Sequence, residues 1–439
     1  MSEVTATAPP RRGPAPPFGR YTPEILFVIG AVLLTAWPLI PKLFGPGKHK
    51  DYVLWYDVGR TVLAGGPLYT PNPQFGFAFL YPPFAAILLA PFSLFDRTFE
   101  IFGLCLVTVA SWWTASKLSE RLSGVPGVKP WWVLALPSVI CLPFIYDMFD
   151  LGQPNLMLLA ILLAGIALLQ MKRQWAAGFM FAAAVALKAF PLAIFPYLIW
   201  RRRWWAALSM LLMTGVFLFL VPAPFRGFER NAQDVKTWAG GMLFSASEKG
   251  FGQRPDQNWG WNNNSLIGVT HRYLRPINAE AENPAAKRLS VNLLNLTFDQ
   301  ANLVLLGVAV LIGLGFIIAL PPERRRTPAS DGAEYALLIS LMTIASPLAR
   351  AYYFVWLLFP FTVLVQRGTM DPDPAVRRRV TWLTVAAIAG FILSIPVGLP
   401  HWPQALGSLF WANAIVAGTL VWLMRRNMAP ATGDQGAAT

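Results

Sequence analysis

The chain has 439 residues, of which 55% are hydrophobic and only 13% are charged, and its mean hydropathy is +0.47. A soluble globular protein needs more polar surface than this composition provides, so the composition excludes that class and predicts a polytopic membrane protein. The net charge of +14 comes from arginine clusters between apolar runs, without an aromatic-interleaved basic face, which argues against a nucleic-acid site.

Both ends of the chain differ from the apolar middle. Residues 1–22 form an arm that is rich in proline and alanine and carries three arginines, and residues 427–439 are small and polar. Neither segment can bury an apolar core, so we expect a disordered cytoplasmic arm and a disordered cytoplasmic tail. The intervening residues 23–426 are expected to form a single transmembrane domain.

Apolar runs near the length of a membrane-spanning helix recur along the chain and predict about twelve spans. They lie at 24–44, 79–95, 99–117, 131–147, 153–171, 176–200, 204–222, 301–320, 334–348, 351–366, 380–399 and 408–424. The runs lack the ten-residue alternation of an outer-membrane barrel, and lipid admits only helices or closed barrels. The expected fold is therefore all-α, a polytopic helical bundle.

The arginine clusters orient this bundle. They lie at 201–203, 324–326, 377–379 and 425–426. By the positive-inside rule they are cytoplasmic, which puts the loop 223–300 and the tip near 346–352 on the outer side and both termini inside. The basic residues between 117 and 173 would also prefer the cytoplasm. Charge alone leaves two topologies open there, one of which makes 176–200 a broken hairpin with Lys188 at its tip.

Two carboxylates, Asp51 and Asp57, follow the first span in the expected first outer loop, 45–78. A carboxylate at the membrane interface is partly desolvated and lies close to any head group that a lipid carries, so its basicity can be raised there. Asp51 and Asp57 are therefore placed for chemistry on a lipid-linked substrate. The alternative is an ordinary polar loop.

Several polar residues interrupt or begin apolar runs. Lys188, in VALKAFPLAIF, would cost about 2.5 to 3.5 kcal/mol at the centre of a spanning helix, so it must face a cavity, a partner or an anion such as a lipid phosphate. Arg350 and Tyr352 lie at an outer tip, where Arg350 is either a ligand for phosphate or an interfacial anchor. Gln153 begins another span and either lines the same cavity or caps the helix, and Tyr81 in LYPPF completes this group of candidate substrate-binding residues.

The large outer loop, 223–300, contains the tract DQNWGWNNNSLIGVTHRYL. Aromatic faces beside amides suit a sugar ring, and a cation beside them suits a phosphate, which makes Asn264 and Arg272 further candidates for substrate binding. The alternative is that the tryptophans anchor the loop at the interface and the amides cap a helix.

Familiar cofactor motifs are missing from the sequence. There is no phosphate-binding GxxxxGK[ST], no dinucleotide fingerprint, no HExxH and no CxxC pair. The Asp-x-Asp pattern at 371–373 lies on a short arginine-rich loop without room for a nucleotide-binding domain. We therefore expect no cofactor, and a divalent metal is allowed but not indicated.

Six motifs occur in a fixed order: the Asp-containing loop ending in LAGGPLY, then YPPFAAILLAP, GQPNLMLL, ALKAFPLAI, NNNSLIG and SPLAR. This order resembles the bacterial polyprenyl-phosphate-sugar hexosyltransferases of glycosyltransferase family 87, in the GT-C superfamily, over roughly residues 24–424. The resemblance implies a multi-pass enzyme of the cytoplasmic membrane. It would move a mannose-like hexose or related sugar from a polyprenyl-phosphate donor to a lipid-linked or glycan acceptor on the outer face, through a site built by the outer loops.

The resemblance also implies roles for single residues. The family's catalytic base is an aspartate in the first outer loop, which Asp51 matches best, with Asp57 in reserve. Lys188 matches the lysine before the family's proline, and Asn264 with Ser265 matches its Asn-x-Ser-like motif. Many members carry a tryptophan and paired histidines after the late Ser-Pro, where this chain has Arg350, Tyr352 and Tyr353. This departure counts against a histidine role and against the mannosyltransferase branch.

The reaction we expect is a single inverting displacement. Asp51 would take the proton of the acceptor hydroxyl as the polyprenyl phosphate leaves, and Lys188, Arg272 and Arg350 would stabilise that phosphate. Two other classes stay open at this point. One is a transporter or flippase of a lipid-linked or amphipathic solute, and the other is a ligase that moves whole glycans.

Overall fold

The computed structural model describes residues 19–44, 51–70, 79–242, 246–247, 250–251, 258–283, 285–396 and 400–428. In this part of the chain the fold is helical, as predicted, with one pair of two-residue antiparallel strands, β1 (Ala246–Ser247) and β2 (Gly250–Phe251). The expected disorder of both tails falls mostly outside the described residues, as do positions 45–50 and 71–78 of the first outer loop.

The helices of the N-terminal half are α1 (Thr22–Phe44), α2 (Asp51–Leu63), α3 (Pro83–Leu89), α4 (Arg97–Leu122), α5 (Trp131–Ile140), α6 (Leu142–Leu151), α7 (Asn155–Gln170), α8 (Gln174–Leu187), α9 (Ile194–Trp200) and α10 (Trp204–Gly215). Those of the C-terminal half are α11 (Ala223–Arg226), α12 (Phe228–Met242), α13 (Leu266–Leu274), α14 (Phe298–Ala319), α15 (Pro328–Ala345), α16 (Leu358–Met370), α17 (Pro374–Leu393), α18 (Trp402–Ala405) and α19 (Ser408–Arg426). Short 3-10 helices at Gly19–Tyr21, Ala90–Leu94, Phe190–Ala193, Glu323–Arg325 and Ala351–Leu357 and a π-helical turn at Val216–Leu220 connect them.

Within the described residues, five helices are long and apolar enough to cross a membrane, or six if the bent pair α5 and α6 counts as one span. The most apolar of them is α14. Of its residues only Ala301 and Ala319 are buried inside the protein. An apolar helix without a protein neighbour on most of its faces needs lipid around it. The chain is therefore an integral membrane protein.

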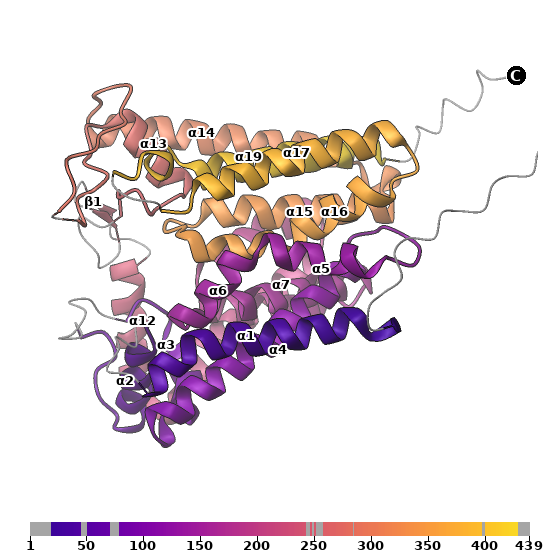
Figure 1. Cartoon of the computed structure of the whole chain (residues 1–439). Coiled ribbons are helices and arrows are strands. Elements are labelled where there is room, and N and C mark those ends of the chain that lie inside the picture. The colour runs from indigo at the N-terminus through magenta and orange to yellow at the C-terminus, as the bar shows by residue number, and fades with distance from the viewer. Residues whose placement is uncertain are drawn as a thin grey trace, which may run out of the picture.

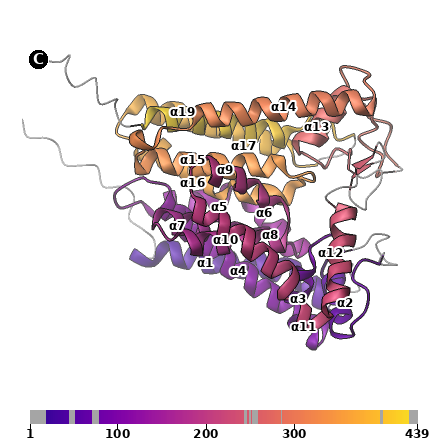
Figure 2. The ribbon, with the colours of Figure 1, turned by 180° about the vertical axis from the view of Figure 1, so that it is seen from behind.

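The long helices run side by side between two ends of the molecule. Figure 1 shows α14, α15, α16, α17 and α19 in one layer and α1, α4, α5 and α7 in the other, and Figure 2 shows the same layers from behind. Helices α2, α3, α12 and α13 gather at the end opposite the C-terminus (Figure 1). We call that end the site end, because Asp51, Gln153 and Lys188 meet there.

The arginine clusters gather at the other end, which we call the arginine end. Arg201 pairs with Glu334 at the start of α15, and its Nη1 donates to the carbonyl of Pro321 at 2.8 Å. Arg326 Nε lies 2.7 Å from Asp331 Oδ1. At the same end Arg426 Nη2 lies 2.6 Å from Asp373 Oδ2, so the last helix ends beside the start of α17.

The chain forms the broken hairpin between 174 and 205. Trp175 at the start of α8 stacks on Trp205 at a ring distance of 5.8 Å, so this segment leaves the arginine end and returns to it. At the tip Lys188 is extended, with φ −159°, and Pro191 begins the 3-10 helix that leads into α9. Because proline lacks the amide hydrogen that a continuous helix needs, one apolar run becomes two short helices.

The span expected at 79–95 was wrong. Residues 83–94 form α3 and a 3-10 helix whose two ends both lie at the site end, since Tyr81 just before them lines a cavity there and Phe95 just after them lies beside α2. This segment packs on α2 instead, where the hydroxyl of Tyr56 donates to the carbonyl of Phe95 at 3.0 Å. A Cβ on Gly59 would lie 2.0 Å from Ser93 Oγ, so glycine permits the close contact.

Candidate active site

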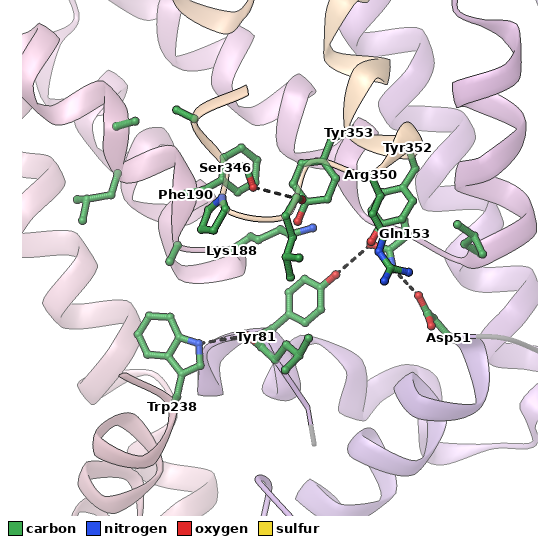
Figure 3. A pocket seen from close by; sticks show the side chains of 18 of the residues that line it. Asp51, Tyr81, Gln153, Lys188, Phe190, Trp238, Ser346, Arg350, Tyr352 and Tyr353 are labelled. Carbon is green, nitrogen blue, oxygen red and sulfur yellow. Dashed lines mark hydrogen bonds between the residues drawn. The ribbon is translucent and has the colours of Figure 1, made fainter. Parts of the chain in front are cut away.

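A cavity of about 420 Å³ opens at the site end between segments that are far apart in the sequence. Its polar lining comes from Asp51, Tyr81, Gln153, Lys188, Ser346, Arg350, Tyr352 and Tyr353, and most of the remaining surface is apolar. Figure 3 shows Asp51 and Trp238 on opposite sides of the cavity, with Tyr81 and Lys188 between them. A cavity with an apolar lining and a few converging polar groups is the usual form of a small-molecule site.

Asp51 is the first residue of α2. The N-terminus of a helix carries a partial positive charge, which favours a carboxylate at that position. The apolar face of α2 holds the helix against the turn between α6 and α7. There the hydroxyl of Tyr52 donates to the carbonyl of Phe149 at 2.7 Å, and Trp55 Nε1 donates to the carbonyl of Gly152 at 2.8 Å. Both of these side chains are buried, so the position of Asp51 is set by packing.

Gln153 lies beside Asp51 and is almost completely buried, with 4% of its surface exposed. Its Nε2 donates to Asp51 Oδ2, and its Oε1 accepts from the hydroxyl of Tyr81 at 3.0 Å. Figure 3 shows the three side chains in a row along one side of the cavity. A carboxylate and a phenol are thus connected through one amide.

Lys188 points into the cavity from the tip of the broken hairpin (Figure 3). Its Nζ donates to Asn155 Oδ1 at 3.2 Å, and it lies 4.1 Å from the ring centre of Tyr353 and 5.1 Å from that of Tyr81. Aromatic faces stabilise a cation by about 0.5 to 2 kcal/mol. Asn155 is itself fixed, because Trp356 Nε1 donates to its carbonyl at 2.8 Å. A charged amine is therefore held ready at the cavity wall.

Arg350 brings a second cation to the cavity. Its side chain is partly buried, with 23% exposed, and its Nη2 lies 3.7 Å from Glu282 Oε1. This separation leaves a loose ion pair, which contributes little and can rearrange around an anion. The cavity thus combines one carboxylate, Asp51, with two cations, Lys188 and Arg350.

Residues 263–265 hold the turn at 346–350, which carries Arg350, through hydrogen bonds. Asn263 Nδ2 and Ser265 Oγ both donate to the carbonyl of Pro347, at 3.0 and 3.1 Å, and the backbone N–H of Asn264 donates to the carbonyl of Ala349 at 2.8 Å. Asn264 is buried and does not line the cavity. Residues 263–265 therefore support the turn that carries Arg350 without lining the cavity themselves.

Arg272 also lies outside the cavity, and only 1% of it is exposed. Its Nη1 donates to the carbonyls of Gly260 and Asn263, each at 2.7 Å, and its Nε donates to the carbonyl of Ala405 at 2.8 Å. Burial lowers the pKa of Arg272 to about 10, which leaves it charged at neutral pH. These contacts join three segments at the site end and give the guanidinium a structural role.

The neighbouring His271 stacks on Trp259 at a ring distance of 4.4 Å. Burial, and then the positive charge of Arg275, lower the pKa of His271 to about 4, so the imidazole is neutral at pH 7. Trp261 stacks in the same way on His401 at 3.9 Å. Trp259 and Trp261 thus each stack on a histidine, and neither lines the cavity.

The structure brings six of the nine predicted site residues together and leaves three outside. The six that line the cavity are Asp51, Tyr81, Gln153, Lys188, Arg350 and Tyr352. Asp57, Asn264 and Arg272 do not line it. Asp57 lies farther along α2, where its carbonyl accepts from Thr61 Oγ1 at 2.8 Å.

One lining residue that sequence reasoning missed is Trp238, which is buried and donates from Nε1 to the carbonyl of Leu80 at 3.3 Å. It belongs to α12, where Asn231, Asp234 and Trp238 are buried at a spacing of three and four residues. Asn231 and Asp234 are polar, so apolar periodicity in the sequence does not reveal this buried face.

The described segments contain no group of three or more His, Cys, Asp or Glu side chains placed to hold a metal ion. The two cations of the cavity are the groups that these segments offer to an anionic substrate. The expectation that no cofactor is needed stays a prediction.

Comparison with known proteins places the chain in a family context. The model of glycosyltransferase family 87 matches residues 79–347, more than half of the chain. Tyr81, Gln153 and Lys188 lie inside the matched region, whereas Asp51 and Arg350 lie outside it.

Two mannosyltransferases of Mycolicibacterium smegmatis are similar over almost the whole chain. The polyprenol-phosphate-mannose-dependent alpha-(1-2)-phosphatidylinositol mannoside mannosyltransferase is 24% identical over 452 residues, which cover 96% of this chain and 91% of the relative. The corresponding phosphatidylinositol pentamannoside mannosyltransferase is also 24% identical and covers 96% of each chain. A solved structure, ArnT from Cupriavidus metallidurans bound to undecaprenyl phosphate, is 13% identical with a TM-score of 0.45, covering 93% of this chain and 78% of that one.

Proposed function

This chain belongs to glycosyltransferase family 87 and is a membrane glycosyltransferase, and from that premise we propose that it moves a hexose from a polyprenyl-phosphate donor to a lipid-linked or glycan acceptor. Mannose is the first candidate for the sugar, because the similar mycobacterial enzymes are named as polyprenol-phosphate-mannose-dependent mannosyltransferases. Tyr352 and Tyr353, which stand where many members carry histidines, are the reason to test other hexoses as well.

The observation that carries this proposal is the combination of charges in the cavity. Asp51 supplies one carboxylate, and Lys188 and Arg350 supply two cations, inside a largely apolar lining at one end of a membrane-embedded bundle. A sugar carried on a lipid phosphate needs cations for the phosphate and apolar surface for the first part of the lipid. An acceptor hydroxyl needs a base.

In the proposed reaction the acceptor oxygen forms a bond to the anomeric carbon while the bond from that carbon to the phosphate oxygen breaks. Asp51 takes the proton of the acceptor hydroxyl, and the electron pair of the broken bond stays on the phosphate. One displacement of this kind inverts the anomeric configuration. Lys188 and Arg350 stabilise the negative charge that the phosphate gains as it leaves, which is the electrostatic contribution expected of fixed cations.

We further propose that the arginine end faces the cytoplasm and the site end faces the outer side of the cytoplasmic membrane, with both termini inside. The twelve end-to-end passages would be α1, α4, the bent pair α5 and α6, α7, α8, the return through α9, α10, α14, α15, α16, α17 and α19. The segment 83–94 would not cross, and the broken hairpin would account for two short passages.

Family membership also bears on the alternative of a transporter or flippase. A carrier moves its solute unchanged, whereas the similar proteins are named as transferases. We therefore propose that the cavity is a reaction site, and the experiment below distinguishes an enzyme from a transporter or flippase.

The test is to reconstitute the purified protein in lipid with radiolabelled polyprenyl-phosphate sugars and a membrane lipid extract as acceptor. Mannose, glucose and galactose donors are compared, and the same reactions are run in detergent, where no compartments exist. We expect a new labelled glycolipid in both settings with one preferred donor. Movement of label across vesicles without any new product would support the carrier and contradict the proposal.

A further inference from the structure

We propose that Gln153 is a positioning residue that holds the carboxylate of Asp51 for reaction, and that Tyr81 in turn holds the side chain of Gln153 in place. This inference rests on the proposed role of Asp51 as the base. It replaces the expectation that Gln153 and Tyr81 contact the substrate. The three side chains form one hydrogen-bonded row (Figure 3).

The chemistry of the groups sets the direction of each hydrogen bond in the row. An ionised carboxylate only accepts hydrogen bonds, so the side of Gln153 that faces Asp51 is the amide nitrogen. The amide oxygen then faces Tyr81, and since that oxygen only accepts, the Tyr81 hydroxyl donates. The flipped amide would turn its oxygen toward the carboxylate, so Asp51 sets the orientation of the amide, and the hydroxyl of Tyr81 supplies the donor that the amide oxygen then requires.

The backbone of Gln153 is fixed by the same helix that carries Asp51. Gly152 is left-handed, with φ +74°, and a Cβ there would lie 2.9 Å from the ring of Tyr52. Its carbonyl accepts from Trp55 at 2.8 Å, and both Tyr52 and Trp55 belong to α2. Asp51 and Gln153 are thus connected twice, by the hydrogen bond between their side chains and by the contacts of α2 with the backbone at Gly152.

Tyr81 is anchored independently. The hydroxyl of Tyr69 donates to the carbonyl of Tyr81 at 2.8 Å, and the ring of Trp55 meets the ring of Tyr81 edge-on at 5.0 Å. Lys188 Nζ lies 5.1 Å from the centre of the Tyr81 ring. Tyr81 therefore also relates the position of the base to that of the cation proposed to bind the phosphate.

Positioning of this kind affects catalysis more than substrate binding. The hydrogen bond from Gln153 to Oδ2 restricts rotation of the Asp51 carboxylate, and so helps to fix its plane toward the acceptor hydroxyl. Misplacing a reacting group by about 1 Å can cost on the order of a hundredfold in rate. A carboxylate in place of the amide would add a second negative charge beside Asp51, and two adjacent carboxylates share a proton, so that one of them titrates at higher pH.

The experiment measures transfer by the full-length protein in lipid as a function of pH, for wild type, Gln153→Leu, Gln153→Glu and Tyr81→Phe. We expect Gln153→Leu to lower kcat about ten- to a hundredfold with KM for the donor within about threefold. Gln153→Glu should move the acidic limb of the pH–rate profile upward by at least about one pH unit. Tyr81→Phe keeps the ring and should cause a smaller fall in kcat.

Gln233→Glu is the matched control, because Gln233 is exposed on α12 and lines no part of the cavity. It should leave the profile unchanged. A raised KM with an unmoved pH profile in the Gln153 variants would overturn the positioning role and indicate contact with substrate. Thermal unfolding of each variant separates these effects from loss of fold.

An Asp51→Asn sample in the same series distinguishes this inference from the proposed function. If Asp51→Asn retains full activity, Asp51 is not the base and the proposed mechanism is wrong. If Asp51→Asn is inactive and Gln153→Glu keeps the wild-type profile, Asp51 stands as the base and only the role of Gln153 is refuted.

Discussion

Replacing Lys188 with methionine removes one charge from the cavity and keeps most of the side chain's volume. Lys188 Nζ is fixed 3.2 Å from Asn155 Oδ1, between aromatic rings that lie 4.1 and 5.1 Å away. A phosphate oxygen that approaches within about 4 Å of the ammonium interacts with it by about 4 kcal/mol at an effective dielectric constant near 20. This figure sets the scale of the expected effect.

The donor phosphate carries one negative charge before reaction and gains a second as it leaves. If about half of that second charge has developed in the transition state, Lys188 favours the transition state over the bound donor by about 2 kcal/mol, or roughly thirtyfold in kcat. Its attraction for the first charge contributes to donor binding, so KM should rise as well. We therefore expect Lys188→Met to lower kcat about thirtyfold and to lower kcat/KM further.

The assay is steady-state transfer with the preferred polyprenyl-phosphate sugar at saturating acceptor. Lys236→Met is the matched control, since Lys236 is exposed on α12 close to Trp238 but lines no cavity. Lys188→Arg should recover part of the lost rate because it restores the charge. A correctly folded Lys188→Met protein with kcat within about threefold of wild type would refute the assignment of Lys188 to the leaving phosphate.

Three further predictions concern Arg272 and His271 in α13 and Gly152 in the turn beside Asp51. Arg272→Met should lower the free energy of unfolding by on the order of 3 kcal/mol, because four backbone carbonyls, those of Trp259, Gly260, Asn263 and Ala405, lose a charged donor. Thermal unfolding in detergent checks this, and an unchanged Tm contradicts it. His271 has a pKa of about 4 in the folded protein and an ordinary value of 6.5, so the unfolded chain takes up a proton at this residue first as the pH falls. The free energy of unfolding should therefore be full above pH 6.5 and decline toward pH 4 by up to about 3 kcal/mol. His271→Gln should flatten this part of the curve of unfolding free energy against pH. Gly152→Ala should lower both Tm and kcat, because left-handed backbone costs an alanine about 1 kcal/mol or more and its Cβ would contact Tyr52; wild-type kcat in this variant would argue against a fixed turn.

The helical fold followed from hydropathy because lipid leaves a chain few other ways to satisfy its backbone. Hydropathy did not resolve where an apolar run breaks. The run 176–200 covers two short helices that Lys188 and Pro191 separate, and the run 79–95 forms a short helix and a 3-10 helix that stay at the site end beside α2. Only packing against α2 decides where the second of these runs lies.

The cavity could be anticipated in part because charged and polar residues at the ends of apolar runs are costly unless they meet. This reasoning selected Asp51, Gln153, Lys188 and Arg350, which the structure brings to one cavity. It could not separate Arg272 from them. A buried arginine that binds backbone carbonyls carries the same sequence signal as one that binds a phosphate, and only its hydrogen bonds reveal the difference.

The role of Asp51 as the base is tested most directly by comparing Asp51→Asn with Asp57→Asn, the same substitution at two positions of α2. Donor binding and a single turnover of bound donor are measured for each. The account predicts near wild-type donor binding for both, a loss of turnover of at least about a hundredfold for Asp51→Asn, and turnover within about threefold of wild type for Asp57→Asn. Full turnover by Asp51→Asn, or a loss confined to Asp57→Asn, would contradict it.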